Sequence, residues 1–97
     1  MSYLLQFLAG VLVTNGIPHW VQGLSGNQFP SPFATPSGVG DSSPLVNVVW
    51  GLANLVGGLV LFCKFATGDT LGWILLALGS LAMAAFCATH FGKVRKR

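Results

Sequence analysis

The chain has 97 residues, of which 53% are hydrophobic and only 7% are charged, and its formal net charge at pH 7 is +3. About a quarter of the residues of a water-soluble globular protein are charged, so this composition excludes that class and indicates an integral membrane protein. We expect one membrane domain that covers residues 1–97.

The few charges are gathered near the C-terminus. The first forty residues contain no Asp, Glu, Lys or Arg, whereas four of the five basic residues lie in the tail, residues 92–97. A basic tail is a common nucleic-acid signal, but this one directly follows an apolar stretch, where the bias of Lys and Arg toward the cytoplasmic side is the simpler cause. We therefore expect no nucleic-acid partner. We expect a multi-pass topology in the bacterial cytoplasmic (inner) membrane, with the N-terminus outside and the C-terminus cytoplasmic.

The first apolar stretch predicts a helix over about residues 1–17, about 25 Å long and slightly short for a bilayer. Asn15-Gly16 is a helix-ending signal, and Pro18 removes a backbone donor from the next turn. Proline is also favoured at a first helical position. Residues 18–24 are therefore expected to form a kinked extension of this helix or a short interfacial segment.

A Pro/Gly-rich loop is predicted over residues 25–43, where no helical period is present. Phe29 and Phe33 stand among its prolines, whereas disordered linkers are normally poor in aromatic residues. Loop backbone exposed to lipid would leave unpaired polar groups. We therefore expect the loop to fold over the cytoplasmic mouth of the helices or to dip into the interface.

Two long apolar stretches predict helices at about residues 44–66 and 70–91, each with the roughly 20 residues that a membrane crossing needs. Ser43 followed by Pro44 is a helix-start signal. The connection between the two helices is so short that they are expected to form an antiparallel hairpin. The predicted fold class is an all-α membrane protein with three transmembrane helices, a C-terminal antiparallel helical hairpin and a long Pro-rich loop between helices 1 and 2.

Small residues recur on the second and third helices at steps of three or four. This spacing lets helix backbones approach closely where lipid supplies no hydrophobic drive for association. The residues expected at these helix contacts are Gly51, Gly58, Ser80, Ala84 and Ala88.

Amide side chains give the sharpest functional signal, because an unpaired amide at bilayer depth is costly. Two hypotheses stay open for them: interhelical hydrogen bonds, or a polar pathway or small-solute site. The candidates are Asn15, Gln22, Asn47 and Asn54. A lone three-helix unit has little interior, so we expect the partners of these amides to come from a homo-oligomer or from a larger membrane complex within the lipid bilayer.

Two histidines are expected near the cytoplasmic interface, each bonded to a neighbouring carbonyl. Cys87 lies one helical turn before His90, and His19 follows the first helix. A haem or metal site built from these three residues would lack a full ligand set, so we expect no metal and no cofactor. The sequence also holds no constellation of nucleophile, base and oxyanion donors, so we do not expect an enzyme.

Three motifs resemble those of a group of short bacterial membrane proteins with three helices. They are Asn15-Gly-Ile-Pro-His-Trp, Phe29-Pro-Ser-Pro-Phe-Ala and Asn47-Val-Val-Trp-Gly. The resemblance covers about residues 15–58 and implies the three-helix architecture. No activity is assigned to that group, so the resemblance implies no functional residue.

These observations favour a small integral membrane protein that acts as an oligomer and is transporter- or channel-like for a small solute, with the Pro-rich loop as its gate. The first alternative is a structural or accessory subunit that docks on a larger complex through its glycine faces and its Phe-Pro loop. The second is a haem or metal protein ligated by histidine.

Overall fold

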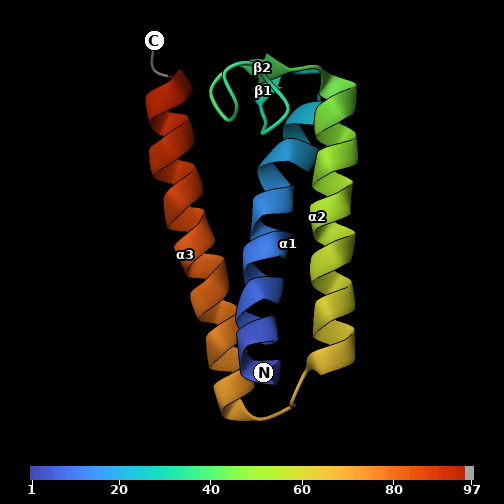
Figure 1. Ribbon diagram of the computed structural model, residues 1–97, viewed down its shortest axis with the longest axis vertical. Coiled ribbons are helices and arrows are strands. Elements are labelled where there is room, and N and C mark those ends of the chain that lie inside the picture. The colour runs from blue at the N-terminus through green and yellow to red at the C-terminus, as the bar shows by residue number, and fades with distance from the viewer. Residues whose placement is uncertain (96–97) are drawn as a thin grey trace.

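The computed structural model describes residues 1–95, and almost all of the regular structure is helical (Figure 1). The helices are α1 (Ser2–Leu24), α2 (Pro44–Phe65) and α3 (Thr70–Arg95). Each is long and apolar enough to cross a membrane. The shortest, α2, has 22 residues and is therefore about 33 Å long, against a hydrocarbon core of about 30 Å. The three membrane-length helices expected from the sequence are thus confirmed.

The helix ends follow the expected start signals. The Ser43 side chain accepts a hydrogen bond from the backbone N–H of Val46, and Pro44 occupies the first turn of α2. α3 runs past its expected end at residue 91 as far as Arg95. Most of the expected basic tail is therefore helical, and Lys96 and Arg97 lie outside the described residues.

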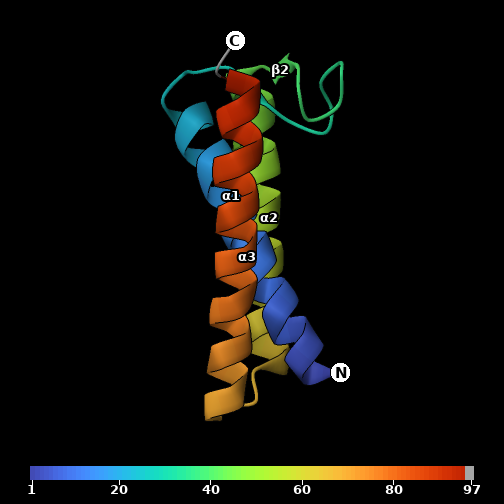
Figure 2. The same ribbon diagram turned by 90° about the vertical axis from the view of Figure 1, so that its left-hand side faces the viewer.

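α1 lies between the other two helices, as both views of the ribbon show (Figures 1 and 2). It packs along α2 and along α3, whereas those two helices hardly approach each other. They do meet close to their connection, where the rings of Phe62 and Trp73 are 5.3 Å apart. α2 and α3 are antiparallel, but the hairpin expected from their short connection is opened by the helix between its arms.

The α1–α2 contact is made through glycines on both helices. The buried residues of α2 lie at steps of three or four and include the expected contact residues Gly51 and Gly58, together with Asn47 and Asn54. A Cβ atom at Gly51 would come within 2.5 Å of the backbone nitrogen of Trp20, and one at Gly16 within 2.8 Å of the Gly51 carbonyl oxygen. Only glycine permits this approach, so the small-residue stripe of α2 packs on the same chain.

The α1–α3 contact includes Ser80, as expected, but otherwise lies at residues that the pattern did not include. A Cβ atom at Gly79 would collide with the Phe7 carbonyl oxygen, and one at Gly10 with the Leu76 carbonyl oxygen. Ser80 lies beside this contact, with its hydroxyl 3.5 Å from the Gly10 carbonyl oxygen. Ala84 and Ala88, also expected at the contact, are exposed. The physical reason is that α3 diverges from α1 toward its C-terminal end (Figure 1).

α1 is continuous through the expected break, with Pro18 inside the helix. Proline removes one backbone donor, and Figure 2 shows that the helix changes direction along its length. Gly16 and Gly23, on either side of Pro18, both pack closely against α2. The kinked extension is therefore the arrangement that the structure shows for residues 18–24.

The Pro/Gly-rich loop lies across the end of the bundle that also holds the C-terminal end of α3 (Figures 1 and 2). Two short strands, β1 (Phe29–Pro30) and β2 (Asp41–Ser42), pair antiparallel, with Phe29 opposite Ser42. Ser31 follows β1, and its hydroxyl is 2.6 Å from that of Ser42. Phe29, Pro30 and Ser31 are buried, so this part of the loop packs into the bundle end.

In the described residues, the distribution of buried and exposed side chains is the reverse of that in a water-soluble protein. The buried hydrophobic side chains are Ala9 and Phe29, whereas several buried residues are polar. Large apolar side chains point outward along all three helices. This distribution is typical of a protein whose outer surface contacts lipid and whose interior holds small and polar groups.

The connection between α2 and α3 is tied to the N-terminal turn of α1. Tyr3 donates a hydrogen bond from its hydroxyl to the Asp69 carboxylate. Asp69 also accepts from the Thr67 hydroxyl at 2.6 Å and from the backbone N–H of Gly72 at 2.9 Å, which caps α3. Gln6 is buried and its side-chain oxygen accepts from the backbone N–H of Thr67 at 3.3 Å. Gln6 therefore anchors this connection to α1.

This connection predicts a loss of stability in acid. Hydrogen bonds from Thr67, Tyr3 and the Gly72 N–H lower the pKa of Asp69 from 3.8 to about 2. A depressed folded-state pKa adds stability that is present above pH about 4 and is lost as the pH falls toward 2. We expect the thermal unfolding temperature in detergent micelles to fall over this window. The Asp69→Asn variant should show a smaller fall, because asparagine still caps the helix but does not titrate.

The control for this prediction is Asp41→Asn, which removes the other acidic side chain of the chain. Asp41 is exposed in β2 at the opposite end of the bundle. The acid-dependent fall should therefore persist in that variant. Equal falls in Asp69→Asn and in the unchanged protein would contradict the role of Asp69.

Candidate functional site

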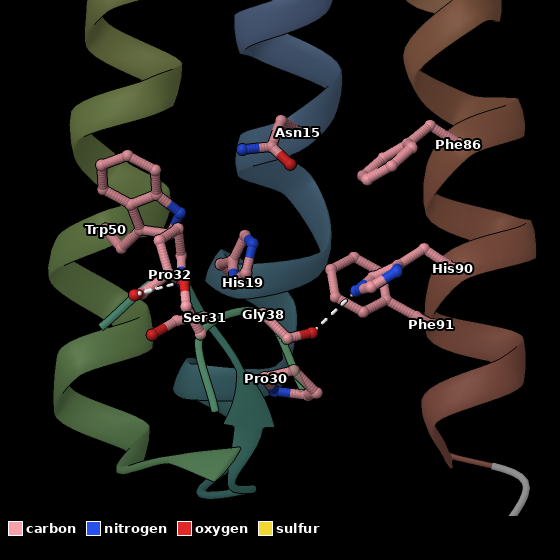
Figure 3. A pocket seen from close by; sticks show the side chains of 11 residues that line it. Asn15, His19, Pro30, Ser31, Pro32, Gly38, Trp50, Phe86, His90 and Phe91 are labelled. Atoms are coloured by element: carbon pink, nitrogen blue, oxygen red, sulfur yellow. Dashed lines mark hydrogen bonds between the residues drawn. The ribbon is translucent and has the colours of Figure 1, made fainter. Parts of the chain in front are cut away.

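A cavity of about 150 Å³ lies beneath the loop, between the three helices (Figure 3). Helices α1 and α2 contribute Asn15, His19 and Trp50 to its wall, and α3 contributes Phe86, His90 and Phe91. The loop covers it with Pro30, Ser31, Pro32, Ser37 and Gly38. An apolar cavity of this volume holds one ring-sized molecule.

His19 is held at the cavity by a buried hydrogen bond to Asn47. Its Nδ1 atom lies 2.7 Å from the Asn47 side-chain oxygen. The side-chain nitrogen of Asn47 donates toward backbone carbonyl oxygens, the nearest being that of Phe29 at 2.9 Å. The Asn47 oxygen therefore faces His19 and can only accept, so the proton of this bond is on Nδ1. The neutral imidazole then carries its lone pair on Nε2.

Aromatic rings surround the His19 side chain. The ring centroids of Phe29, Phe91 and Trp50 lie 5.3, 5.8 and 6.5 Å from that of His19, all in edge-to-face orientations. The exposed fraction of His19 is 2%. The imidazole is therefore in an apolar environment. Its Nε2 atom is the side-chain nitrogen that has no hydrogen bond.

Trp50 supplies the complementary group. Its indole Nε1–H is buried and has no hydrogen-bond partner, and within residues 1–95 it is the one buried side-chain donor or acceptor in that state. Figure 3 shows this nitrogen turned toward the space between the helices. Leaving a buried donor unsatisfied costs about 1–3 kcal/mol. An unpaired donor beside a cavity is therefore a candidate contact for a hydrogen-bond acceptor.

His90 joins α3 to the loop. Its Nε2 atom lies 2.7 Å from the Gly38 carbonyl oxygen, and because a carbonyl accepts, the imidazole donates. The imidazole also stacks on Phe86, with ring centroids 5.3 Å apart and an interplanar angle of 6°. Gly38 has a φ of 72°, a conformation that favours glycine. This hydrogen bond ties α3 to the part of the loop that covers the cavity.

The four amides expected at a polar pathway or at helix contacts have partners within the chain. Asn15 donates to the Asn54 side-chain oxygen at 3.1 Å, and Asn54 donates to the Trp50 carbonyl oxygen at 2.9 Å. Gln22 is outside the cavity wall and accepts from Asn27 at 2.9 Å. α1, α2 and the loop thus give each of these amides a partner within the chain, whereas the homo-oligomer or larger complex stays a prediction.

The histidine and cysteine candidates for a metal site are only partly brought together. His19 and His90 line the same cavity, but the Phe91 ring contacts both imidazoles. Cys87 lies with its sulfur 4.0 Å from the Asn15 side-chain oxygen. Among the residues that the structure describes, no group of three His, Cys, Asp or Glu side chains is placed to hold a metal ion.

Several cavity residues escape sequence reasoning. Trp50 is not among the residues that the sequence singles out, although it lies about one helical turn after Asn47 and carries a polar atom that needs a partner when buried. Ser31 and Phe91 gave no signal of their own. Phe91 directly follows His90, and adjacency to a histidine in an apolar stretch was the one cue that the chain offered.

The fold and the cavity define a class, namely a small helical protein with three membrane-length helices and a loop-covered cavity at one end of the bundle. Comparison of the chain with protein-family models, with curated proteins and with solved structures found no match. Evidence for the function therefore comes from the residues of the cavity.

Proposed function

We propose that the protein is a transporter-like integral membrane protein that takes up a small solute in the cavity beneath its loop. The observation that carries this proposal is the buried, unpartnered Trp50 Nε1–H beside a cavity of about 150 Å³. A tryptophan whose role is purely structural normally has a hydrogen-bond partner for its indole N–H when that group is buried. A solute with a hydrogen-bond acceptor would supply one.

The loop end of the bundle is proposed to face the cytoplasm of a bacterium. Lys93 and Arg95 lie at the C-terminal end of α3, the end of the bundle that also holds the loop (Figure 1). Basic residues favour the cytoplasmic side of the inner membrane. The solute would then enter or leave the cavity on the cytoplasmic side, and the N-terminus would lie outside.

Docking on a larger complex has less support from the described residues. The glycine faces that would serve it, at Gly51 and Gly58, are occupied by α1. The large apolar side chains on the outer surface are what lipid contact alone requires.

The binding proposal is tested with fluorobenzene, a neutral probe of ring size. The chain has three tryptophans, and their indole N–H signals in NMR spectra of the micelle-bound protein can be assigned from single Trp→Phe variants. We expect the Trp50 signal alone to shift, and to saturate as the probe is added. Trp20 and Trp73 do not line the cavity and serve as internal controls. Equal, unsaturable shifts of all three signals would show partition into the micelle and contradict the proposal.

The role of the loop as a gate is tested with His90→Phe, which removes the hydrogen bond between α3 and the loop. Phenylalanine keeps the ring contacts with Phe86 and Phe91 but cannot donate to the Gly38 carbonyl oxygen. A single hydrogen bond contributes about 1 kcal/mol, so we expect hydrogen exchange of the loop amides to become about fivefold to tenfold faster. Fluorobenzene should also dissociate faster.

The control for this variant is Gly92→Ala. No atom lies within 4 Å of a Cβ built at Gly92, so this change on the same helix should leave loop exchange unaltered. If His90→Phe exchanges its loop amides at the original rate, the hydrogen bond to Gly38 does not hold the loop.

A further inference from the structure

We infer that the solute of this cavity is a neutral, single-ring molecule that carries a hydroxyl group, that is, a ligand of the phenol class. This inference rests on the proposed binding function, and it adds the chemistry by which the ligand is recognised.

First, most of the polar side chains in the cavity wall already have hydrogen-bond partners, and few polar atoms are free to bind a ligand. The Ser31 hydroxyl pairs with Ser42, and the Ser37 hydroxyl donates to the Pro32 carbonyl oxygen at 2.8 Å. The His90 Nε2–H is used by Gly38. Among the aromatic side chains of the wall, the donor that remains is the Trp50 Nε1–H, and each imidazole keeps one lone pair, on Nε2 of His19 and on Nδ1 of His90. The imidazole with a ring contact to Trp50 is that of His19.

The second step is the group that fits this pair. A hydroxyl oxygen accepts one hydrogen bond and donates another, so it can pair with both atoms at once. Both side chains line the same cavity and their ring centroids are 6.5 Å apart, so a single oxygen in the cavity is proposed to meet both polar atoms. A carbonyl or ether oxygen would satisfy Trp50 and leave the His19 lone pair unused.

The third step concerns the charge and shape of the ligand. No Asp, Glu, Lys or Arg of the described residues lines the cavity, so an ionic ligand would be buried without a counter-charge. Trp50, Phe86 and Phe91 instead form aromatic walls, and aromatic rings pair favourably with one another. The volume of about 150 Å³ admits one such ring. A phenol is neutral near pH 7, since the phenolic pKa is about 10.

The inference is tested by comparing three probes of similar size in ¹⁹F NMR titrations of the micelle-bound protein. 4-Fluorophenol can donate and accept, 4-fluoroanisole can only accept, and fluorobenzene does neither through oxygen. Each probe is first titrated into protein-free micelles, and the partition measured there is subtracted. We expect 4-fluorophenol to bind about tenfold more tightly than fluorobenzene, since one net hydrogen bond contributes up to about that factor. 4-Fluoroanisole should bind more weakly than 4-fluorophenol, because it has no proton for His19.

A matched pair of variants locates the donor. Trp50→Phe keeps an aromatic wall and removes the N–H, so the preference for 4-fluorophenol over fluorobenzene should fall to about threefold or less. Trp73→Phe makes the same change near the opposite end of the bundle, beside Phe62, and should leave the preference intact. The comparison of 4-fluorophenol with 4-fluoroanisole needs no variant, and so tests the inference even if Trp50→Phe does not fold.

The outcomes separate this inference from the proposed function. If all three probes bind equally and shift the Trp50 signal, the cavity binds a solute but does not select a hydroxyl group, and the inference is overturned alone. A preference that survives in Trp50→Phe also overturns it. If no probe shifts the Trp50 signal saturably, both the inference and the binding proposal fail.

Discussion

Gly58→Ala is expected to destabilise the bundle by about 1–3 kcal/mol, the range for inserting a methyl group into closely packed atoms. A Cβ atom at Gly58 would lie 2.5 Å from a methyl carbon of Val13 and 2.9 Å from the Ala9 carbonyl oxygen. The carbonyl belongs to the α1 backbone and cannot rotate away as a flexible side chain does. The helices must therefore separate, which weakens the whole α1–α2 contact.

The matched control is the neighbouring glycine. A Cβ atom at Gly57 would meet only a methyl carbon of Leu12, at 3.8 Å, which is ordinary van der Waals contact. Gly57→Ala should leave the protein as stable as before or raise its stability by up to about 1 kcal/mol, because alanine is the better helix former. Both variants carry the same chemical change in the same helix, so their difference isolates the packing.

The measurement for this pair is unfolding by SDS in mixed micelles, followed by tryptophan fluorescence. Membrane helices stay helical after they separate, so the signal must report tertiary contact and not helix content. A transition of Gly58→Ala at the same SDS fraction as that of Gly57→Ala would show that the close approach at Gly58 is not required.

Asn47→Leu is expected to cost about 2–5 kcal/mol and to loosen the loop. Leucine has a similar size but leaves the Nδ1–H of His19 and the Phe29 carbonyl oxygen without their partner. An unsatisfied buried polar group costs about 1–3 kcal/mol, and two are created here. Asn47 is fully buried, with an exposed fraction of 0%, so water does not compensate without opening the structure.

Asn54→Leu is the control for Asn47→Leu. Asn54 accepts from Asn15 and donates to the Trp50 carbonyl oxygen. That carbonyl is the i−4 acceptor within α2, and Asn15 is only half-buried. The loss should therefore be about 1 kcal/mol, as for an ordinary interhelical hydrogen bond.

Two measurements distinguish these variants: SDS unfolding, and protease cleavage within residues 25–43. Asn47→Leu should be cut faster in the loop because the amide binds backbone on both sides of it, at Phe29 and at Ser42. Asn54→Leu should not be, since its contacts are confined to α1 and α2. Equal loop cleavage in the two variants would contradict the assigned role of Asn47.

Much of the architecture was readable from local pattern. Charge-free apolar length predicts the helices, and Ser43-Pro44 predicts the start of α2. The step of three or four residues from Asn47 to Gly58 predicts the buried face of α2, because residues at that spacing share one side of a helix. These features depend on neighbours in the chain, which a sequence displays directly.

The contacts of α3 were less predictable from the sequence, because residue spacing alone leaves several choices. Ser80, Ala84 and Ala88 have the right spacing. Two glycines of α3 nevertheless make the closest approaches to α1. Gly72 lies beside the Gln6 side chain, and Gly79 lies against the Phe7 backbone. Several sets of small residues on α3 satisfy the pattern. Which of them is used depends on the tilt of α3 against α1, and tilt is not encoded in spacing.

The sequence by itself determined that three apolar helices of membrane length form, where they begin, and which face of α2 is buried. Only the tertiary structure decided that α1 lies between the other two helices, that Asn47 holds His19, and that Trp50 keeps an unpartnered N–H beside a cavity under the loop. The physical reason is that periodicity names a face but not the neighbour that covers it. That neighbour is set by how glycines on opposite sides of α1, Gly16 toward α2 and Gly10 toward α3, let backbones approach.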